Sequence, residues 1–81
     1  MNALCELALL NEQKLLAMNH WFSVLDNVAL RMDSPDRYHD QLLRQADEMD
    51  RLGLIDWAEC RALRALADRI WLRAVAGEDY R

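Results

Sequence analysis

Helix-breaking residues are rare in this 81-residue sequence, which contains two glycines and one proline. Gly and Pro are the residues least compatible with a helix interior, and here they stand only at positions 35, 53 and 77. Between these positions, hydrophobic residues recur every three or four residues, as they do along one side of an α-helix. The sequence therefore predicts an all-α fold built from a few long helices.

The first helix is expected to cover residues 3–32, a stretch without Gly or Pro. Asn11 is the weakest point in it, because Asn can cap the start of a new helix. We favour one continuous helix over two collinear ones. The main hydrophobic stripe comprises Leu4, Leu7, Leu15, Met18, Phe22, Leu25, Ala29 and Met32, and it is widened by Leu10, Trp21 and Val28.

A second helix is expected over residues 35–52. Ser34 can cap its N-terminus, Pro35 suits the first helical position, and Asp36 complements the positive end of the helix dipole. Gly53 ends the helix, because a residue just past a helix end often takes a left-handed conformation. The hydrophobic stripe of this helix comprises Tyr38, Leu42, Ala46, Met49 and Leu52.

The third helix is expected over residues 57–76. Asp56 and Glu59 have the spacing of a capping box, and Gly77 follows the last helical residue. The core stripe comprises Cys60, Leu63, Ala67, Ile70, Trp71 and Ala74, and we expect Trp57 to be a core anchor like Trp71. Short turns make neighbouring helices antiparallel, so residues 1–81 are predicted to form one three-helix bundle, a long first helix plus a helical hairpin.

A chain of this size buries only about 60% of the surface that its unfolded form exposes, so a partner subunit would help to stabilise it. The first helix has hydrophobic residues on the side away from its main stripe, namely Cys5, Leu9 and Leu16. Exposed apolar patches commonly mark association surfaces, and the sequence therefore predicts a homodimer formed through these residues. The alternative is that the other two helices wrap around the first.

The third helix also has a second hydrophobic side. Small residues recur there at alternating spacings of four and three, as in a coiled-coil seam, and arginines flank them. We predict that this side binds a second protein through Ala58, Arg61, Ala62, Arg64, Ala65, Leu72 and Arg73, with Ala76 at the end of the seam. The alternative is a solvated face rich in alanine, a good helix former.

Candidate catalytic and metal-binding groups are few. Asp36, His39 and Asp40 lie within one helical turn and could share a metal ion. We favour a capped, solvated first turn, and His20 is expected at the surface. No nucleophile and base stand at a suggestive spacing, so the sequence predicts neither an enzyme nor a bound cofactor or metal.

The net charge of −4 argues against a general nucleic-acid binder, which normally has a basic surface. The alternative is a helix-turn-helix regulator, with Gly53 in the turn and arginines on the third helix. The acidic run 47–50 is expected to solvate the second helix. The alternative is that this run, together with Asp36 and Asp40, is recognised by a basic partner such as a nucleic-acid-binding protein.

Localisation and function follow from the remaining features. The cysteines lack metal-site or disulfide-framework spacing, which favours free thiols in the cytoplasm. Glu6 within the N-terminal apolar run is untypical of a signal peptide, and charge is too evenly spread for a membrane span. Nine of the ten basic residues are Arg, a bias that fits a GC-rich bacterial or phage genome. The sequence thus predicts a non-enzymatic adaptor or inhibitor that binds and modulates another protein.

Overall fold

Four helices make up the part of the chain that the structure describes. The computed structural model describes the backbone of residues 3–77 and the side chains of Leu9 and of residues 11–77. The helices are α1 (Ala3–Leu25), α2 (Val28–Asp33), α3 (Pro35–Arg51) and α4 (Trp57–Val75). The predicted all-α class is confirmed, whereas the prediction of three helices is wrong.

The chain breaks at Asn27 and not at Asn11, so the expected helix 3–32 is two helices. Asn27 caps α2, its side-chain oxygen accepting a bond from the Leu30 amide at 3.0 Å. The hydroxyl of Tyr38 donates to the carbonyl of Leu25, one of the groups left without a helical partner where α1 ends. Because both ends of the break are satisfied in this way, the chain turns here at little cost. The helix is continuous through Asn11, as predicted.

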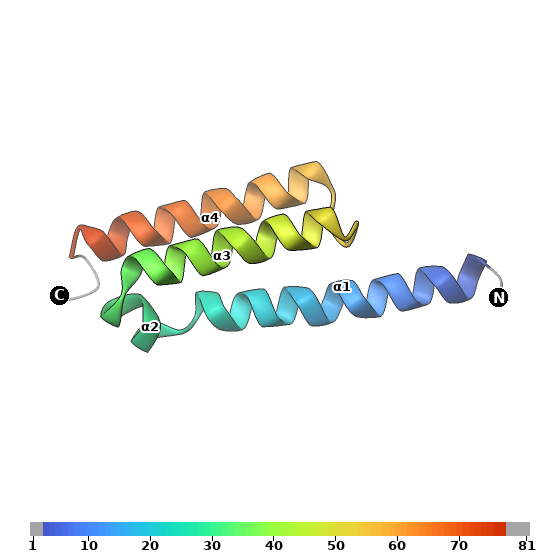
Figure 1. Ribbon diagram of the computed structural model, residues 1–81, viewed down its shortest axis with the longest axis horizontal. Coiled ribbons are helices and arrows are strands. Elements are labelled where there is room, and N and C mark those ends of the chain that lie inside the picture. Colours follow the sequence, from blue (N-terminus) through green and yellow to red (C-terminus); the bar gives the residue numbers. More distant parts are fainter. Residues whose placement is uncertain (1–2, 78–81) are drawn as a thin grey trace.

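The central helix is α3, which packs on α4, α1 and α2. Figure 1 shows α3 and α4 side by side as a hairpin, with α1 along the other side of α3 and α2 at the corner between them. The predicted combination of a long helix and a hairpin is therefore present. The short α2 replaces the end of the expected first helix.

The core lies along both sides of α3. It contains Trp21, Val24 and Leu25 of α1, Tyr38, Leu42, Ala46 and Met49 of α3, Ile55 of the turn, and Cys60, Leu63 and Ala67 of α4. The stripes predicted for the second and third helices supply most of these residues. Leu52 was predicted in the core but is 51% exposed, because it follows the last turn of α3.

The structure buries a different side of α1 from the side that was predicted to enter the core. Leu15 and Phe22 are exposed, whereas Trp21, placed at the edge of the predicted stripe, is completely buried. Hydrophobic residues lie on several sides of this helix, so spacing alone fits more than one orientation. The orientation that occurs lets the Trp21 indole donate a hydrogen bond to the Leu42 carbonyl, which a buried indole requires.

The helix ends follow the sequence signals closely. Asp56 accepts from the Glu59 amide at 2.7 Å and the Glu59 carboxylate accepts from the Asp56 amide at 3.1 Å, so the capping box is confirmed. Gly53 has a φ of 74° just past the end of α3, as predicted. Ser34 precedes Pro35 at the start of α3, but its hydroxyl makes no capping bond there, and that part of the prediction is wrong.

The N-terminal half of α1 extends past the hairpin. The Lys14 ammonium lies 2.7 Å from the Glu59 carboxylate at the start of α4. Beyond this point α1 continues past the α3–α4 turn, and no other helix of the described chain lies beside it (Figure 1). The molecule is elongated as a result, with extents of 53 × 21 × 17 Å.

Candidate interaction surfaces

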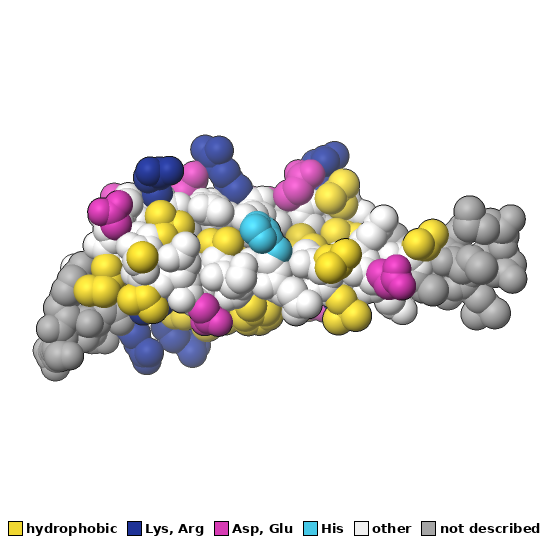
Figure 2. All heavy atoms as spheres, turned by 90° about the horizontal axis from the view of Figure 1, so that it is seen from below, with side chains coloured by type: hydrophobic (Ala, Val, Ile, Leu, Met, Phe, Trp, Pro, Cys, Tyr) yellow, Lys and Arg dark blue, Asp and Glu magenta, His cyan; other side chains and the backbone are white. Residues whose placement is uncertain are grey.

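The side of α1 turned away from α3 exposes two leucines. Leu9 is 50% and Leu16 70% exposed, and their seven-residue separation places them on the same side of the helix, two turns apart. We call Leu9 and Leu16 the α1 surface. Both are where the sequence predicted self-association, whereas the side chain of Cys5, the third predicted residue, lies outside the described part. Figure 2 looks onto the molecule from the α1 side and shows separate hydrophobic patches along its length.

A groove of about 180 Å³ lies between α1 and the end of α3. The part of its lining that solvent can reach is almost entirely apolar. The residues around the groove are Ala17, His20, Gln45, Glu48, Met49, Leu52 and Leu54. His20 is four residues from Leu16, so these two side chains are neighbours on the helix and the groove adjoins the α1 surface. The groove could not be predicted from the sequence, because it depends on how α1 packs against α3.

One polar atom beside the groove has no partner among the described residues. The side-chain oxygen Oε1 of Gln45 is buried without a hydrogen bond, although Nε2 of the same amide lies 3.2 Å from Nε2 of His20. A buried polar atom without a partner is destabilising. The described part of the chain therefore leaves this acceptor unsatisfied next to a groove-lining histidine.

The outward side of α4 carries the residues predicted to bind a partner. Ala58, Arg61, Ala62, Ala65, Leu72 and Arg73 are all exposed, and Leu72 retains 56% of its accessible surface. Arg64 differs, because it is half-buried and its guanidinium lies 2.7 Å from the Asp47 carboxylate of α3. We call the exposed set, together with Trp57, the α4 surface.

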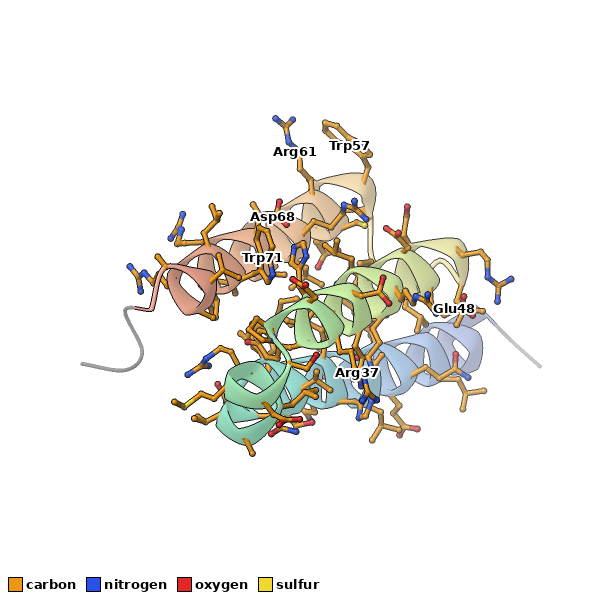
Figure 3. All side chains as sticks on the ribbon, turned by 60° about the vertical axis from the view of Figure 1, so that its left-hand side comes forward. Arg37, Glu48, Trp57, Arg61, Asp68 and Trp71 are labelled. Atoms are coloured by element: carbon orange, nitrogen blue, oxygen red, sulfur yellow. The ribbon has the colours of Figure 1, made fainter. Side chains whose placement is uncertain are left out.

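Trp57 is the main correction on α4. It was predicted to anchor the core, yet it is 70% exposed. The Arg61 guanidinium lies over its ring, 5.4 Å from the centroid, and both side chains project away from the bundle (Figure 3). They border a shallow depression of about 390 Å³ that is lined by Trp57, Cys60, Arg61, Arg64, Ala65 and Asp68. Trp57 is the first residue after the Asp56 cap and is only about 60° around the helix from the buried Cys60, so helical spacing alone does not reveal its exposure.

Acidic residues of α3 lie beside arginines. Asp40 pairs with Arg44, Asp47 with Arg64, and Glu48 with Arg51. The hydrogen bond from Arg51 lowers the pKa of Glu48, and the same contact raises the pKa of Arg51. Each of these three acids therefore has a cation of the same chain beside it, which reduces the negative field available to a basic partner.

The histidine predicted in a solvated first turn takes part in a contact between α3 and α4. His39 Nε2 lies 2.6 Å from Oδ1 of Asp68, and its ring stacks on Trp71 with centroids 4.7 Å apart. Trp71 in turn donates from Nε1 to Asp36 at 3.1 Å. Asp36 and His39 are thus engaged with α4 and do not converge on a point with Asp40. Among the described residues, no three His, Cys, Asp or Glu side chains are grouped to hold a metal ion.

Cys60 is a buried free thiol. Its sulfur lies 3.7 Å from the carbonyl oxygen of Ala46. Burial raises the pKa of the thiol, and the nearby carboxylates of Asp50 and Asp47 raise it further. A thiol in this environment is a poor nucleophile, because the reactive form is the thiolate.

The geometry of α3 and α4 differs from that of a DNA-binding motif. In a helix-turn-helix the two helices cross at about 90–120°, whereas α3 and α4 run side by side along the hairpin (Figure 1). Within the described residues, no helix is both long enough and apolar enough to cross a membrane.

No family model, curated protein or solved structure matches this chain. The two exposed surfaces are therefore the features from which a function is inferred.

Proposed function

We propose that this protein is a non-enzymatic helical interaction module, which forms a homodimer through α1 and uses the outward side of α4 to bind and modulate a second protein. The observation that carries the proposal is that large hydrophobic side chains are exposed on two helices that flank α3, Leu9 and Leu16 on one and Trp57 and Leu72 on the other. The proposed setting is the cytoplasm of a bacterium, and the protein would be encoded by that bacterium or by its phage.

Burial energetics support a partner at α1. Transfer of a leucine side chain from water to an apolar contact is worth about 1.5–3 kcal/mol, and Leu9 and Leu16 each retain at least half of their accessible surface. The chain itself offers no helix to cover them in its described part (Figure 1). A second copy supplies such a helix without requiring any other molecule.

The composition of the α4 surface supports a protein ligand. Trp and Arg are the residues most enriched among those that dominate binding energy in protein interfaces, and Trp57 and Arg61 stand together at one end of α4. The alanines between Arg61 and Leu72 leave room for the backbone of a partner helix to approach. Arg61 is exposed at the edge of the α4 surface. This surface therefore suits a partner helix that has an apolar side bordered by acidic residues.

The alternatives have less support. A DNA-binding regulator would need a crossing helix pair and a basic surface, whereas α4 packs along α3 and Arg64 is paired with Asp47. Nucleophilic catalysis with His39 as the base would need a nucleophile beside its ring, and the contacts of that ring are Asp68 and Trp71.

Two double variants test the proposal as matched controls for each other. Replacing Leu9 and Leu16 with Glu should give a monomer in light scattering while leaving partner capture intact. Replacing Ala65 and Leu72 with Glu should leave the dimer intact and abolish capture of any protein that the wild type retains from a bacterial lysate. All four positions are exposed, so neither variant should disrupt the core, and both should remain folded and predominantly helical by circular dichroism.

Other results would contradict the proposal. A dimer that persists in the α1 variant would remove the self-association surface, and equal capture by both variants would remove the α4 surface. A salt-dependent shift of duplex DNA by the wild type would instead favour the regulator.

A further inference from the structure

We infer that the partner of the α4 surface is an acidic amphipathic helix of another protein, whose apolar side contacts Trp57 and Leu72 and whose carboxylates pair with Arg61 and Arg69. The inference rests on the proposed binding of a second protein by α4 and specifies the chemistry of that protein. Arg69 is exposed next to the α4 surface, four residues after Ala65.

Charge is distributed unevenly between the helices. α4 contains four arginines and two acids, whereas α3 contains three arginines and five acids. The two acids of α4 already contact other helices, because the Glu59 carboxylate lies 2.7 Å from the Lys14 ammonium of α1 and the Asp68 carboxylate lies 2.6 Å from His39 of α3. The outward side of α4 is therefore basic in a protein whose net charge is −4.

Arg61 and Arg69 are available to a partner on this side. Both are exposed, and no carboxylate of the described residues forms an ion pair with either of them. The Arg61 guanidinium lies over the Trp57 ring, and both side chains project away from the bundle (Figure 3). Arginine presents its N–H donors as a planar fork that matches the two oxygens of a carboxylate. An acidic side chain of a partner would therefore accept from donors that the described chain leaves to water.

The positions of these residues around α4 fit one side of a partner helix. At 3.6 residues per turn, Trp57, Arg61 and Leu72 lie within about 60° of one another around the helix axis, and Arg69 lies about 60° beyond Leu72. Apolar and basic groups thus share one side of α4. An amphipathic helix has an apolar stripe about 100° wide with polar residues along its borders, so acids at those borders would meet the arginines.

Backbone hydrogen bonding favours a helical partner over an extended one. Within α4 the backbone N–H and C=O groups bond to each other, so the side of the helix offers no backbone partner to a segment that lies along it. An extended segment would bury N–H and C=O groups without hydrogen bonds, which is costly. A helix satisfies these groups internally, and the alanines between Trp57 and Leu72 let it approach closely.

The apolar groups favour a protein over a nucleic acid. Leu72 is 56% exposed, and a row of phosphates would leave it in contact with water. A polyanion would also come close to the five acids of α3, which packs directly on α4. An acidic helix brings apolar side chains to Leu72 and carboxylates only to the arginines.

The side of one helix is a small contact. α4 has 19 residues and is about 28 Å long and 10 Å wide, so this side alone is smaller than the roughly 800 Å² that each partner of a stable complex buries. Binding through it is therefore reversible, and charge acts mainly on selectivity and on the rate of association. A test of the partner's chemistry must accordingly compare charges.

Two designed peptides test this chemistry. Each has three heptads with leucine at the first and fourth positions, and with either glutamate or lysine at the fifth and seventh, where like charges oppose pairing of the peptide with itself. In fluorescence anisotropy the Glu peptide should bind the wild type at least about tenfold more tightly than the Lys peptide, although the net charge of −4 favours the opposite order. Added salt should weaken binding of the Glu peptide.

Two double variants locate the binding. Arg61→Glu combined with Arg69→Glu should weaken binding of the Glu peptide by more than about tenfold, because like charges then face each other. The matched control, Arg37→Glu combined with Arg44→Glu, makes the same change in net charge on α3 and should retain the preference for the Glu peptide. All four arginines are exposed, so both variants should remain folded and predominantly helical by circular dichroism.

The outcomes separate the acidic helix from the proposed function. No binding of the Glu peptide at near-millimolar concentration, equal binding of the two peptides, or an equal loss in the two double variants would overturn the inference. The α4 surface itself would still stand if Ala65→Glu combined with Leu72→Glu abolishes capture of a lysate protein.

Two further results would overturn the inference by identifying another occupant. Binding of duplex DNA or single-stranded RNA that is lost in the Arg61→Glu and Arg69→Glu variant would identify a nucleic acid. A solution mass of this variant that differs from that of the wild type would identify a second copy of the chain, whereas the acidic helix predicts an unchanged mass.

Discussion

The indole Nε1 of Trp21 donates a hydrogen bond to the backbone carbonyl of Leu42 across 3.0 Å. The two residues belong to α1 and α3 and are completely buried. This bond joins the long helix to the hairpin, and Trp21 enters the core together with Val24 and Leu25 of the same helix. Leu9 and Leu16 lie on another side of α1 and remain exposed.

Trp21→Ala should therefore destabilise the fold strongly. Removal of a buried Trp side chain costs about 3–5 kcal/mol, a large share of the 5–15 kcal/mol that stabilises a typical domain. Trp57→Ala removes the same side chain from a position that is 70% exposed and should change stability by less than about 1 kcal/mol. Urea unfolding at equal protein concentration checks both, and similar losses in the two variants would contradict the packing described.

The two N-caps should respond differently to mutation. Asp56→Ala removes a side chain that accepts a bond from the Glu59 amide and should cost about 0.5–2 kcal/mol. Ser34→Ala should cost less, because the Ser34 hydroxyl makes no capping bond at the start of α3. Thermal unfolding of the two variants gives the comparison, and an equal or larger loss for Ser34→Ala would contradict these cap assignments.

Acid should weaken the contact between α1 and α4. Bonds from Lys14 and from the Asp56 amide lower the pKa of Glu59 below its ordinary value of 4.5, so folding favours the ionised carboxylate. Its contribution to stability is complete above the ordinary pKa and is lost as the pH falls through the lower folded-state pKa.

Glu59→Gln provides the control for this pH dependence, because Gln preserves the capping box but does not titrate. The stability of the wild type should exceed that of the variant at neutral pH, and the difference should shrink as the pH falls below 4.5. Unfolding curves across this range measure it. A difference that grows with acid would show that the carboxylate is not stabilised by folding.

Cys60 should be unreactive while the protein is folded. The thiol is buried, and burial raises its pKa, so little thiolate is available to an alkylating reagent near pH 8. In a Cys5→Ser background, iodoacetamide labelling followed by mass spectrometry should be slow without denaturant and fast in urea. Equal rates in the two conditions would contradict the burial of Cys60.

The helix boundaries were accessible from sequence because local signals determine them. The positions of Pro35 and Gly53 and the pairing of Asp56 with Glu59 act over a few residues, and each appears in the structure where the sequence indicated. The break at Asn27 was missed. One part of it is local, since Asn27 caps α2. The other part, the bond from Tyr38 to the Leu25 carbonyl, forms only when α3 has folded back.

The candidate surfaces were partly accessible. Leu9 and Leu16 are exposed where the sequence showed a second apolar side, but the buried side of α1 was misplaced because several orientations satisfied helical spacing. The exposure of Trp57 and the groove beside His20 depend on how α1, α3 and α4 pack together. Periodicity within single helices does not contain this information.

The mass of the wild-type protein in solution tests the central claim most directly, namely that α1 buries its exposed leucines against a second copy. We predict that light scattering across a series from low micromolar to near-millimolar concentration gives a mass that rises toward twice 9.5 kDa. A mass that stays at 9.5 kDa throughout the series would contradict the claim.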